Sequence, residues 1–240
     1  KSFGGIGLMD KYVLIVAGGK GLRMGGDLPK QFIPMRGKPL LMHTLEAFHR
    51  WDASARIILV LPEDHQPYWN MLCKEIGCKV PHAIVKGGDT RFFSVKNGLD
   101  WLLAERRRKG EEDSGLSLVA VHDGVRPFVS PEVVEACFDK AAVTGAVIPV
   151  VPMIDSLRET DEKGSHPVDR SRYMAVQTPQ VFHLELLTKA YEQPYSSLFT
   201  DDASVVEAMG HAIDTVPGDR ENIKITTPFD LLIAEAMFAR

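Results

Sequence analysis

Short apolar runs alternate with segments of helical period along most of the chain. The runs fit buried strands: "YVLIVA" at 12–17, "RIILVLP" at 56–62, "AIVK" at 83–86, "LSLVAVHD" at 116–123 and "AVIPVVP" at 146–152. Between the runs, apolar residues recur every three or four positions, as Leu41, Leu45 and Phe48 do. This spacing predicts helices over 39–50, 66–76, 92–109, 131–143 and 229–240.

The alternation of strands and helices predicts the fold class. We expect an α/β protein with a Rossmann-like, mostly parallel sheet that helices cover on both faces. Ligands of such sheets bind beyond the carboxyl ends of the strands. The loops that follow the strands are therefore where a site is expected, and three of them have unusual compositions: "GGKGLRM", "KGGDTR" and "HDGVRP".

One segment, from Ile154 to Gln177, breaks this rhythm. It is polar, with "DEKGSHP" in its middle and β-type residues on either side. We predict a two-stranded β-arm with a turn near Gly164. An isolated hairpin is only marginally stable in water, so we expect the arm to pack on another body, a second subunit, and to serve in dimerisation.

Length and charge limit the remaining possibilities. The 240 residues suit one large α/β domain. We expect that domain over 9–240, with residues 1–8 as a non-native or disordered extension. The net charge of −4 excludes a surface built as a whole for nucleic acid. A polyanion site must then be a local basic cluster.

Cysteine usage and hydropathy favour the cytoplasm. The three cysteines, Cys73, Cys78 and Cys137, argue against a disulfide framework and for a reducing compartment. We expect all three to be packing residues. No apolar run approaches the roughly 20 residues that a membrane span needs. The expected protein is cytoplasmic, with no membrane and no nucleic-acid partner.

The stretch "AGGKGLRMGGDLPKQF", at 17–32, combines five glycines with Lys20, Arg23 and Lys30. Glycines let backbone N–H groups converge on an anion, and the cations add charge, so the loop suits a phosphate chain. Two familiar phosphate loops are excluded. The chain has no G-x-x-x-x-G-K-[ST], and Met24 stands where G-x-G-x-x-G needs its third glycine. A plain turn is the alternative for a glycine-rich stretch alone.

Five stretches together resemble one enzyme family. To the glycine-rich loop the chain adds "KGGDTRFFSV", "HDGVRPFV", "VDRSRYMAVQTPQVF" with "TDDASVVE", and "NIKITTPFDL". In this order and spacing they are similar to 2-C-methyl-D-erythritol 4-phosphate cytidylyltransferases, of the sugar-phosphate nucleotidyltransferase superfamily. The resemblance runs from about Tyr12 to the end of the chain. The ribitol-5-phosphate cytidylyltransferases share the first loop and "HD-x-x-RP" and are the alternative.

The resemblance implies a transferase of the non-mevalonate isoprenoid pathway that joins CTP to a phosphate monoester and releases pyrophosphate. The attacking phosphate has a second pKa of about 6 and is already ionised at neutral pH, so no general base is needed. Repulsion between the two anions is the physical difficulty. Catalysis then rests on positioning and on neutralising the developing charge.

The resemblance also implies which residues hold CTP. Arg23 and Lys30 match the cations that stabilise the transition state at the α-phosphate, and Asp123 matches the Mg²⁺ ligand. An N-cap or turn aspartate is the alternative for Asp123. Lys20 is either a phosphate contact or a solvated lysine. The triphosphate cradle and the cytidine contacts match Ala17, Gly18, Gly19, Gly88, Asp89 and Ser94.

The acceptor phosphate has its own set of residues by the same resemblance. Arg170 and Lys224 match those that place it for attack, and Arg126 either pairs with a carboxylate or faces its phosphate. The hydroxyl-bearing contacts match Ser156, Thr178 and Thr200; Ser156 replaces the family's usual threonine. In the family the arm crosses a homodimer, so Arg170 would act in the neighbour's site.

Neighbouring residues and other function classes complete the interpretation. We expect His122 to be a packed, hydrogen-bonded histidine and Arg91 to brace its loop. A nucleotide-sensing module without turnover is the alternative from another class, but the residues that turnover needs are present with their motifs. A hexose-1-phosphate nucleotidyltransferase using UTP or GTP is disfavoured by the short chain and by the arm.

Overall fold

The computed structural model describes residues 9–18, 28–111 and 115–239. Its helices include α1 (Leu40–Trp51), α2 (Gln66–Ile76), α3 (Arg91–Lys109), α4 (Pro131–Thr144) and α7 (Pro228–Phe238). Its longer strands are β1 (Asp10–Val16), β4 (Arg56–Leu61), β5 (His82–Lys86), β6 (Ser117–Asp123) and β7 (Ala146–Pro152). Every helix and strand that the apolar pattern predicted is present, which confirms those predictions.

The strands form one mixed sheet that is parallel on one side. Its order is β10-β7-β11-β6-β1-β4-β5, and β12 also pairs with β7. Strands β6, β1, β4 and β5 are parallel neighbours. Strand β11 (Gln180–His183) lies antiparallel between β6 and β7, and β10 (Met174–Val176) is antiparallel to β7. The predicted α/β class is confirmed, with an antiparallel portion that the pattern did not show.

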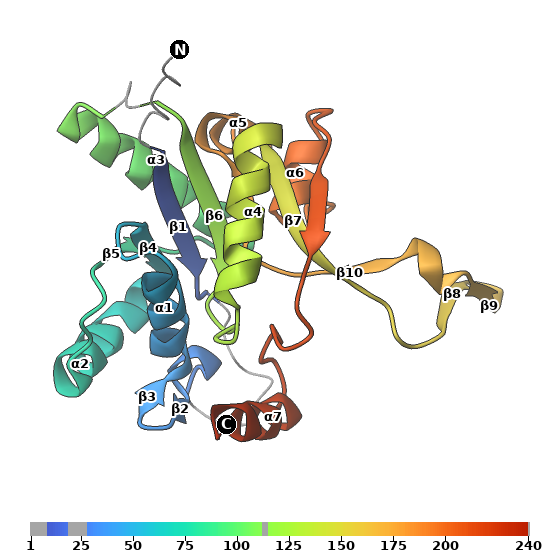
Figure 1. The fold of residues 1–240 in the computed structure, drawn as a ribbon, viewed down its shortest axis with the longest axis horizontal. Coiled ribbons are helices and arrows are strands. Elements are labelled where there is room, and N and C mark those ends of the chain that lie inside the picture. The colour runs from blue at the N-terminus through green and yellow to red at the C-terminus, as the bar shows by residue number, and fades with distance from the viewer. Residues whose placement is uncertain (1–8, 19–27, 112–114, 240) are drawn as a thin grey trace, which may run out of the picture.

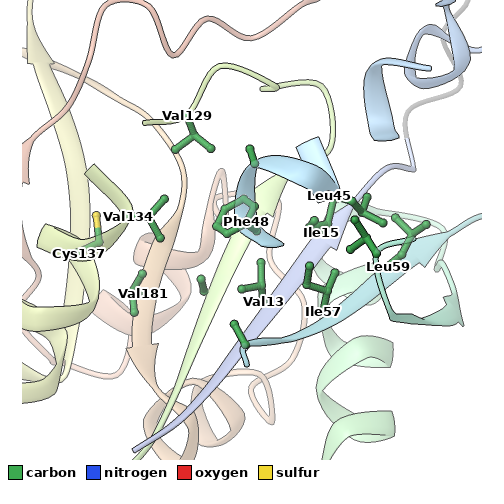
Figure 2. Packing of buried hydrophobic residues seen from close by; sticks show 14 of the residues in the cluster. Val13, Ile15, Leu45, Phe48, Ile57, Leu59, Val129, Val134, Cys137 and Val181 are labelled. Atoms are coloured by element: carbon green, nitrogen blue, oxygen red, sulfur yellow. The ribbon is translucent and has the colours of Figure 1, made fainter. Parts of the chain in front are cut away.

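Helices cover both faces of the sheet, as predicted. Alternate residues of β1 point to opposite faces: Val13 and Ile15 join one apolar cluster, and Tyr12 and Leu14 join the other. Figure 2 shows the first cluster, where Phe48 of α1 packs over β1. Both faces are therefore closed to water, as the continuous apolar strands require.

Several short elements escaped the sequence pattern. Among the described residues they are the strands β2 (Pro34–Met35), β3 (Lys38–Pro39), β10, β11 and β12 (Asp214–Pro217), the helices α5 (Leu184–Ala190) and α6 (Asp202–Glu207), and three 3-10 helices such as η2 (Lys30–Phe32). None is longer than seven residues. Such pieces are too short to display a period, and they form because the neighbouring sheet supplies partners.

The predicted arm is present and projects from the body (Figure 1). Strands β8 (Leu157–Asp161) and β9 (Gly164–Val168) form a separate two-stranded sheet. They pair antiparallel from Leu157↔Val168 to Asp161↔Gly164. Glu162 and Lys163 form the turn, and Gly164, which follows them, has a φ of 131°, in the range that favours glycine. Nearly every residue of the arm is exposed.

The C-terminal helix closes the end of the molecule at which β1 and β6 finish (Figure 1). It packs through Ala234 into a small apolar cluster with Met35, Leu40 and Val125. Phe238 contacts the rings of Phe128 and His43 at 4.5 and 4.3 Å. Among the described residues no helix is long and apolar enough to cross a bilayer.

Candidate active site

A hollow of about 240 Å³ lies at the carboxyl ends of the parallel strands. It is formed where the loops after β1, β5 and β6 meet. Its lining includes eight of the predicted site residues: Ala17, Gly18, Lys30, Gly88, Asp89, Ser94, Asp123 and Lys224. The structure thus brings together segments from four separate motifs of the sequence.

A second hollow, of about 310 Å³, adjoins the first. It is lined by the predicted acceptor residues Arg126, Thr178 and Thr200. The two hollows share three residues, Arg91, Asp123 and Lys224. Two ligands bound side by side would therefore meet at these shared side chains.

A larger hollow, of about 850 Å³, lies elsewhere, beside Ser117 at the amino end of β6. Its lining contains none of the predicted site residues. Ligands of parallel sheets bind at the carboxyl ends of strands, where the charged side chains of this chain also converge. The smaller pair of hollows is therefore the candidate site.

Asp123 is the electrostatic centre of the site. Its Oδ2 atom lies 3.1 Å from Arg126 Nε and 3.2 Å from Lys224 Nζ, and its Oδ1 atom lies 3.9 Å from Arg91 Nε. Burial alone would raise the pKa of this carboxyl, but the charges of Lys224, Arg91 and Arg126 hold the pKa well below its usual range. Asp123 is therefore ionised at all physiological pH values.

Lys224 reaches Asp123 because its loop runs alongside the loop after β6. The Ile225 N–H donates to Val125 O at 3.0 Å. Arg126 fastens the same two loops, since its Nη1 donates to Asn222 O at 2.7 Å. Of the two roles open for Arg126, the structure shows the pairing with a carboxylate; its contact with a substrate phosphate stays a prediction.

His122 and Thr178 support Asp123 from below. The Asp123 N–H donates to Thr178 Oγ1 at 3.1 Å. The Thr178 hydroxyl lies 3.0 Å from His122 Nδ1, and His122 Nε2 lies 3.0 Å from Arg126 O. Burial lowers the pKa of His122 to about 4, so the ring is neutral and donates from Nε2 to that carbonyl. His122 is packed and hydrogen-bonded, as predicted, and Thr178 has two protein partners beside any ligand.

The loop after β5 is held tightly at Gly88. Its N–H donates to Ser94 Oγ at 3.0 Å, and Ser94 is nearly fully buried. A Cβ at Gly88 would lie 2.5 Å from Phe93 Cβ and 2.8 Å from the Phe93 carbonyl carbon. Only glycine fits so close an approach. Ser94, predicted as a cytidine contact, therefore also fixes the shape of the loop.

The end of β1 is fixed by a residue that the sequence did not single out. Gln31 is buried and donates from Nε2 to Ala17 O at 3.1 Å. The Ala17 N–H donates to Val60 O at 3.0 Å. The N–H of Ala17 is therefore taken by a protein partner, although Ala17 lines the first hollow, and its contact with a triphosphate stays a prediction. Gly18 lines the hollow, as predicted.

Lys30 sits beside Gln31 in the turn η2. That turn is anchored by Phe32, whose ring stacks on Trp69 at 6.4 Å and meets Tyr68 edge-on at 5.2 Å. The apolar anchor on one side and the Gln31 hydrogen bond on the other direct Lys30 to the wall of the first hollow.

Some predicted residues do not join this constellation. Gly19, Lys20 and Arg23 lie outside the described residues. Ser156 and Arg170 lie on the arm segment and are exposed; Arg170 donates to Ile154 O. Neither lines the two hollows of its own chain. Their predicted roles therefore require a second subunit and stay predictions.

Buried polar side chains around the site were missed in the sequence. Asp202 has no exposed surface and accepts two hydrogen bonds from Arg91. Asn222 is equally buried and donates to Thr178 O at 2.8 Å. An aspartate within "TDDAS" and an asparagine within "NIKITTP" were available signals. Nothing local distinguishes a buried polar residue from a solvated one, however.

Fold and site together define a class of protein: an α/β protein with two adjoining hollows, lined by charged side chains, at the carboxyl edge of its sheet, an arrangement that suits anionic ligands. The model of one family, 2-C-methyl-D-erythritol 4-phosphate cytidylyltransferase, matches residues 12–240. The chain belongs to this family.

Relatives agree with the family match. A protein of Bacteroides fragilis named 2-C-methyl-D-erythritol 4-phosphate cytidylyltransferase is 56% identical over 229 residues, 95% of this chain and 100% of that protein. One of Porphyromonas gingivalis with the same name is 52% identical over 95% of this chain and 97% of its own length.

Solved structures agree as well. The crystal structure of 2-C-methyl-D-erythritol 4-phosphate cytidylyltransferase from Thermus thermophilus has a TM-score of 0.71 and 31% identity, and covers 96% of this chain and 100% of that one. The structure of 4-diphosphocytidyl-2C-methyl-D-erythritol synthase from Anaerococcus prevotii has a TM-score of 0.77 and 28% identity, with 96% of both chains covered.

Proposed function

We propose that the two adjoining hollows are where this chain, a cytidylyltransferase by family, transfers CMP from CTP to 2-C-methyl-D-erythritol 4-phosphate. The observation that carries the proposal is that both hollows share Arg91, Asp123 and Lys224. CTP would occupy the first hollow, between Gly18 and Gly88, and the acceptor the second, beside Thr200. The acceptor phosphate would then face the α-phosphate of CTP across Lys224.

The reaction requires no proton abstraction. An oxygen of the acceptor phosphate, ionised at neutral pH, forms a bond to the α-phosphorus of CTP, and the bond to the β-phosphate oxygen breaks to release pyrophosphate. Lys30 and Lys224 would neutralise the charge that accumulates on the α-phosphate oxygens. His122, the histidine nearest the centre, is neutral and fully occupied by protein partners, in agreement with a mechanism that needs no base.

The donor atoms around Asp123 fit a magnesium ion. Within the described part of the chain, Asp123 Oδ2 carries the contacts to Arg126 and Lys224, whereas Oδ1 accepts no hydrogen bond and has only the 3.9 Å ion pair with Arg91. One carboxylate oxygen completed by phosphate oxygens and waters is ordinary Mg²⁺ coordination. We propose that Asp123 Oδ1 holds Mg²⁺, which would supply positive charge to the triphosphate.

The arm completes the site in a homodimer under this proposal. Arg170 and Ser156 lie on an arm that projects away from its own body (Figure 1). Large apolar side chains at the arm's base are exposed, among them Ile154, Tyr173 and Met174. Covering them with a second copy would bury apolar surface and would bring Arg170 to the partner's acceptor hollow.

We also propose that the protein is located in the cytoplasm, in keeping with its three cysteines, which form no disulfide.

The test is pyrophosphate release from the purified chain with CTP, Mg²⁺ and one sugar phosphate at a time. We expect release with 2-C-methyl-D-erythritol 4-phosphate and a far slower reaction with ribitol 5-phosphate. UTP in place of CTP should react poorly as well. Equal or faster turnover of ribitol 5-phosphate would refute the proposed acceptor. Nucleotide binding without any turnover would indicate a sensing module instead.

A further inference from the structure

An ion pair, fully buried at Asp202 and partly exposed at Arg91, joins the two loops that line the hollows. Arg91 donates from Nη1 to Asp202 Oδ1 at 3.0 Å and from Nη2 to Asp202 Oδ2 at 2.7 Å. This is the two-pronged geometry that makes arginine–carboxylate pairs both strong and specific in direction. Tyr191 donates its hydroxyl to Asp202 Oδ1 at 2.6 Å. Asp202 has no exposed surface, so water does not compete for these bonds.

Arg91 and Asp202 each lie directly after a loop that lines a hollow. Arg91 is the first residue of α3 and directly follows the loop 87–90, which holds Gly88 and Asp89. Asp202 is the first residue of α6 and directly follows Thr200 and Asp201 of the acceptor hollow. Each partner is therefore the first helical residue after a loop that lines a hollow. The ion pair connects these two positions, which are 111 residues apart in sequence.

An aromatic cluster reinforces the same junction. Phe92 stacks on Tyr191 with ring centres 4.7 Å apart and on Phe199 at 5.7 Å. Phe93 contacts Tyr195 at 5.6 Å. These rings come from α3 on one side and from the segment 191–199 on the other. Apolar packing of this kind leaves the two loops little freedom to move independently.

Charge balance separates Arg91 from the phosphate-binding cations. Both of its terminal nitrogens are committed to Asp202, which neutralises its charge inside the protein. The remaining Nε faces Asp123 Oδ1 at 3.9 Å. Arg91 lines both hollows, but with this geometry it acts as part of the wall. A phosphate that took its terminal nitrogens would leave Asp202 buried and unpaired, which is costly.

We propose that the Arg91–Asp202 pair is a clamp that sets the nucleotide loop and the acceptor loop in one relative position, so that binding in one hollow organises the other. Arg91, Asp202 and Tyr191 are then positioning residues for the transfer. The inference rests on the proposed function for its kinetic consequences, but the clamp itself predicts a structural coupling that can be measured without turnover.

The first measurement is hydrogen exchange of backbone amides with and without CTP and Mg²⁺. In the wild type, CTP should slow exchange in residues 87–94 and also in 199–206, although the second segment lines the other hollow. In Asp202→Asn and Arg91→Lys, the protection should remain at 87–94 and disappear at 199–206. Protection confined to 87–94 in the wild type would overturn the clamp, whether or not the chain turns over any acceptor.

The second measurement is steady-state kinetics of the same variants. Lysine keeps the charge of Arg91 but cannot make two parallel bonds. We expect Arg91→Lys and Asp202→Asn to lower kcat and to raise the acceptor KM by about tenfold, a usual size for coupling between two sites. Tyr191→Phe, which keeps the ion pair, should show a smaller change in the same direction and serves if Asp202→Asn does not fold.

A matched control exists at the opposite edge of the sheet. Arg106 is buried and donates to Asp10 Oδ2 at 3.3 Å and to the Tyr12 hydroxyl at 2.6 Å, the same arginine–aspartate–tyrosine combination away from both hollows. Asp10→Asn should lower the melting temperature but leave kcat, both KM values and CTP-induced protection unchanged. If Asp202→Asn, assayed well below its own melting temperature, behaved like Asp10→Asn, the pair would be structural only and the proposal would fail.

Discussion

At the residue scale, the site is a balance of charges around one carboxylate. Asp123 is buried beside three cations, and the nearest two, Arg126 and Lys224, contact the same oxygen. Arg126 is also fixed to Asn222, whereas Lys224 has a half-exposed side chain that faces both hollows. Lys224 is therefore the shared cation with the most freedom to move from Asp123 to an incoming phosphate.

Replacing Lys224 tests this assignment. Lys224→Met keeps most of the volume of the side chain and removes the charge where the two anions meet. We expect kcat to fall by about 10²–10³, the usual loss for one transition-state contact. The control is Lys140→Met. Lys140 lies on the exposed surface of α4, where its Nζ donates to Thr215 O, and this variant should match the wild type in pyrophosphate-release assays. A variant at position 224 with undiminished kcat would contradict the proposed role.

At the scale of elements, a histidine joins α2 to the edge strand β5. Trp69 of α2 donates its indole N–H to His82 Nε2 at 3.0 Å, and His82 Nδ1 lies 2.8 Å from Val80 O. An indole can only donate and a carbonyl can only accept, so both contacts require the neutral ring. Burial lowers the pKa of His82 below its ordinary value of 6.5, and this effect is larger than the opposing effect of the hydrogen bond to the Val80 carbonyl.

This contact predicts a pH dependence of stability. Because the pKa is lower in the folded state, the unfolded chain binds more protons as the pH falls below 6.5, and folding stability declines. Urea unfolding at pH 7.5 and pH 5.5 should show a lower free energy of unfolding at pH 5.5. His82→Gln, which cannot titrate, should narrow that difference. His166→Gln, on the exposed arm, is the control and should leave the difference between the two free energies of unfolding unchanged. If His82→Gln also left this difference unchanged, His82 would not be a source of the pH dependence.

At the scale of the whole molecule, the arm is the feature whose stability and role are not accounted for by a single chain. Among the described residues, strands β8 and β9 pair only with each other, and they project from the body (Figure 1). Arg170 lies in η4 (Arg170–Arg172), directly after these strands, and lines neither hollow of its own chain. A hairpin of this size is marginally stable alone. The proposed homodimer accounts for both facts, because each arm would pack on the partner and complete the partner's site.

Mixing two inactive variants tests the exchange of arms. Arg170→Ala and Lys224→Met should each be nearly inactive, one lacking the arm residue and the other its own shared cation. Random mixing in a twofold dimer leaves one intact site in each heterodimer, so about a quarter of wild-type activity should return. Unfolding and refolding the two variants together, then measuring pyrophosphate release, checks this. If Arg170 acted within its own chain, the refolded mixture would stay inactive.

The apolar pattern was sufficient for the framework, and motif composition was sufficient for part of the site. All the predicted strands and helices are present. They could be predicted because the apolar residues of a buried strand or an amphipathic helix recur with a regular period along the sequence. The loops with glycine and charge did converge, since the carboxyl ends of parallel strands meet at one edge. The short pieces β11, α5 and α6 were not predictable, because their stability comes from neighbours distant in sequence.

What the sequence determined by itself was local: which segments are strands or helices, which segments carry Lys30, Asp123 and Lys224, and which family they resemble. What only the tertiary structure decided was the pairing of side chains. That Arg91 meets Asp202 across 111 residues, and that Ala17 has already given its N–H to Val60, depends on how the elements pack. A period or a motif reports neighbours along the chain, whereas charge compensation and burial depend on neighbours in space.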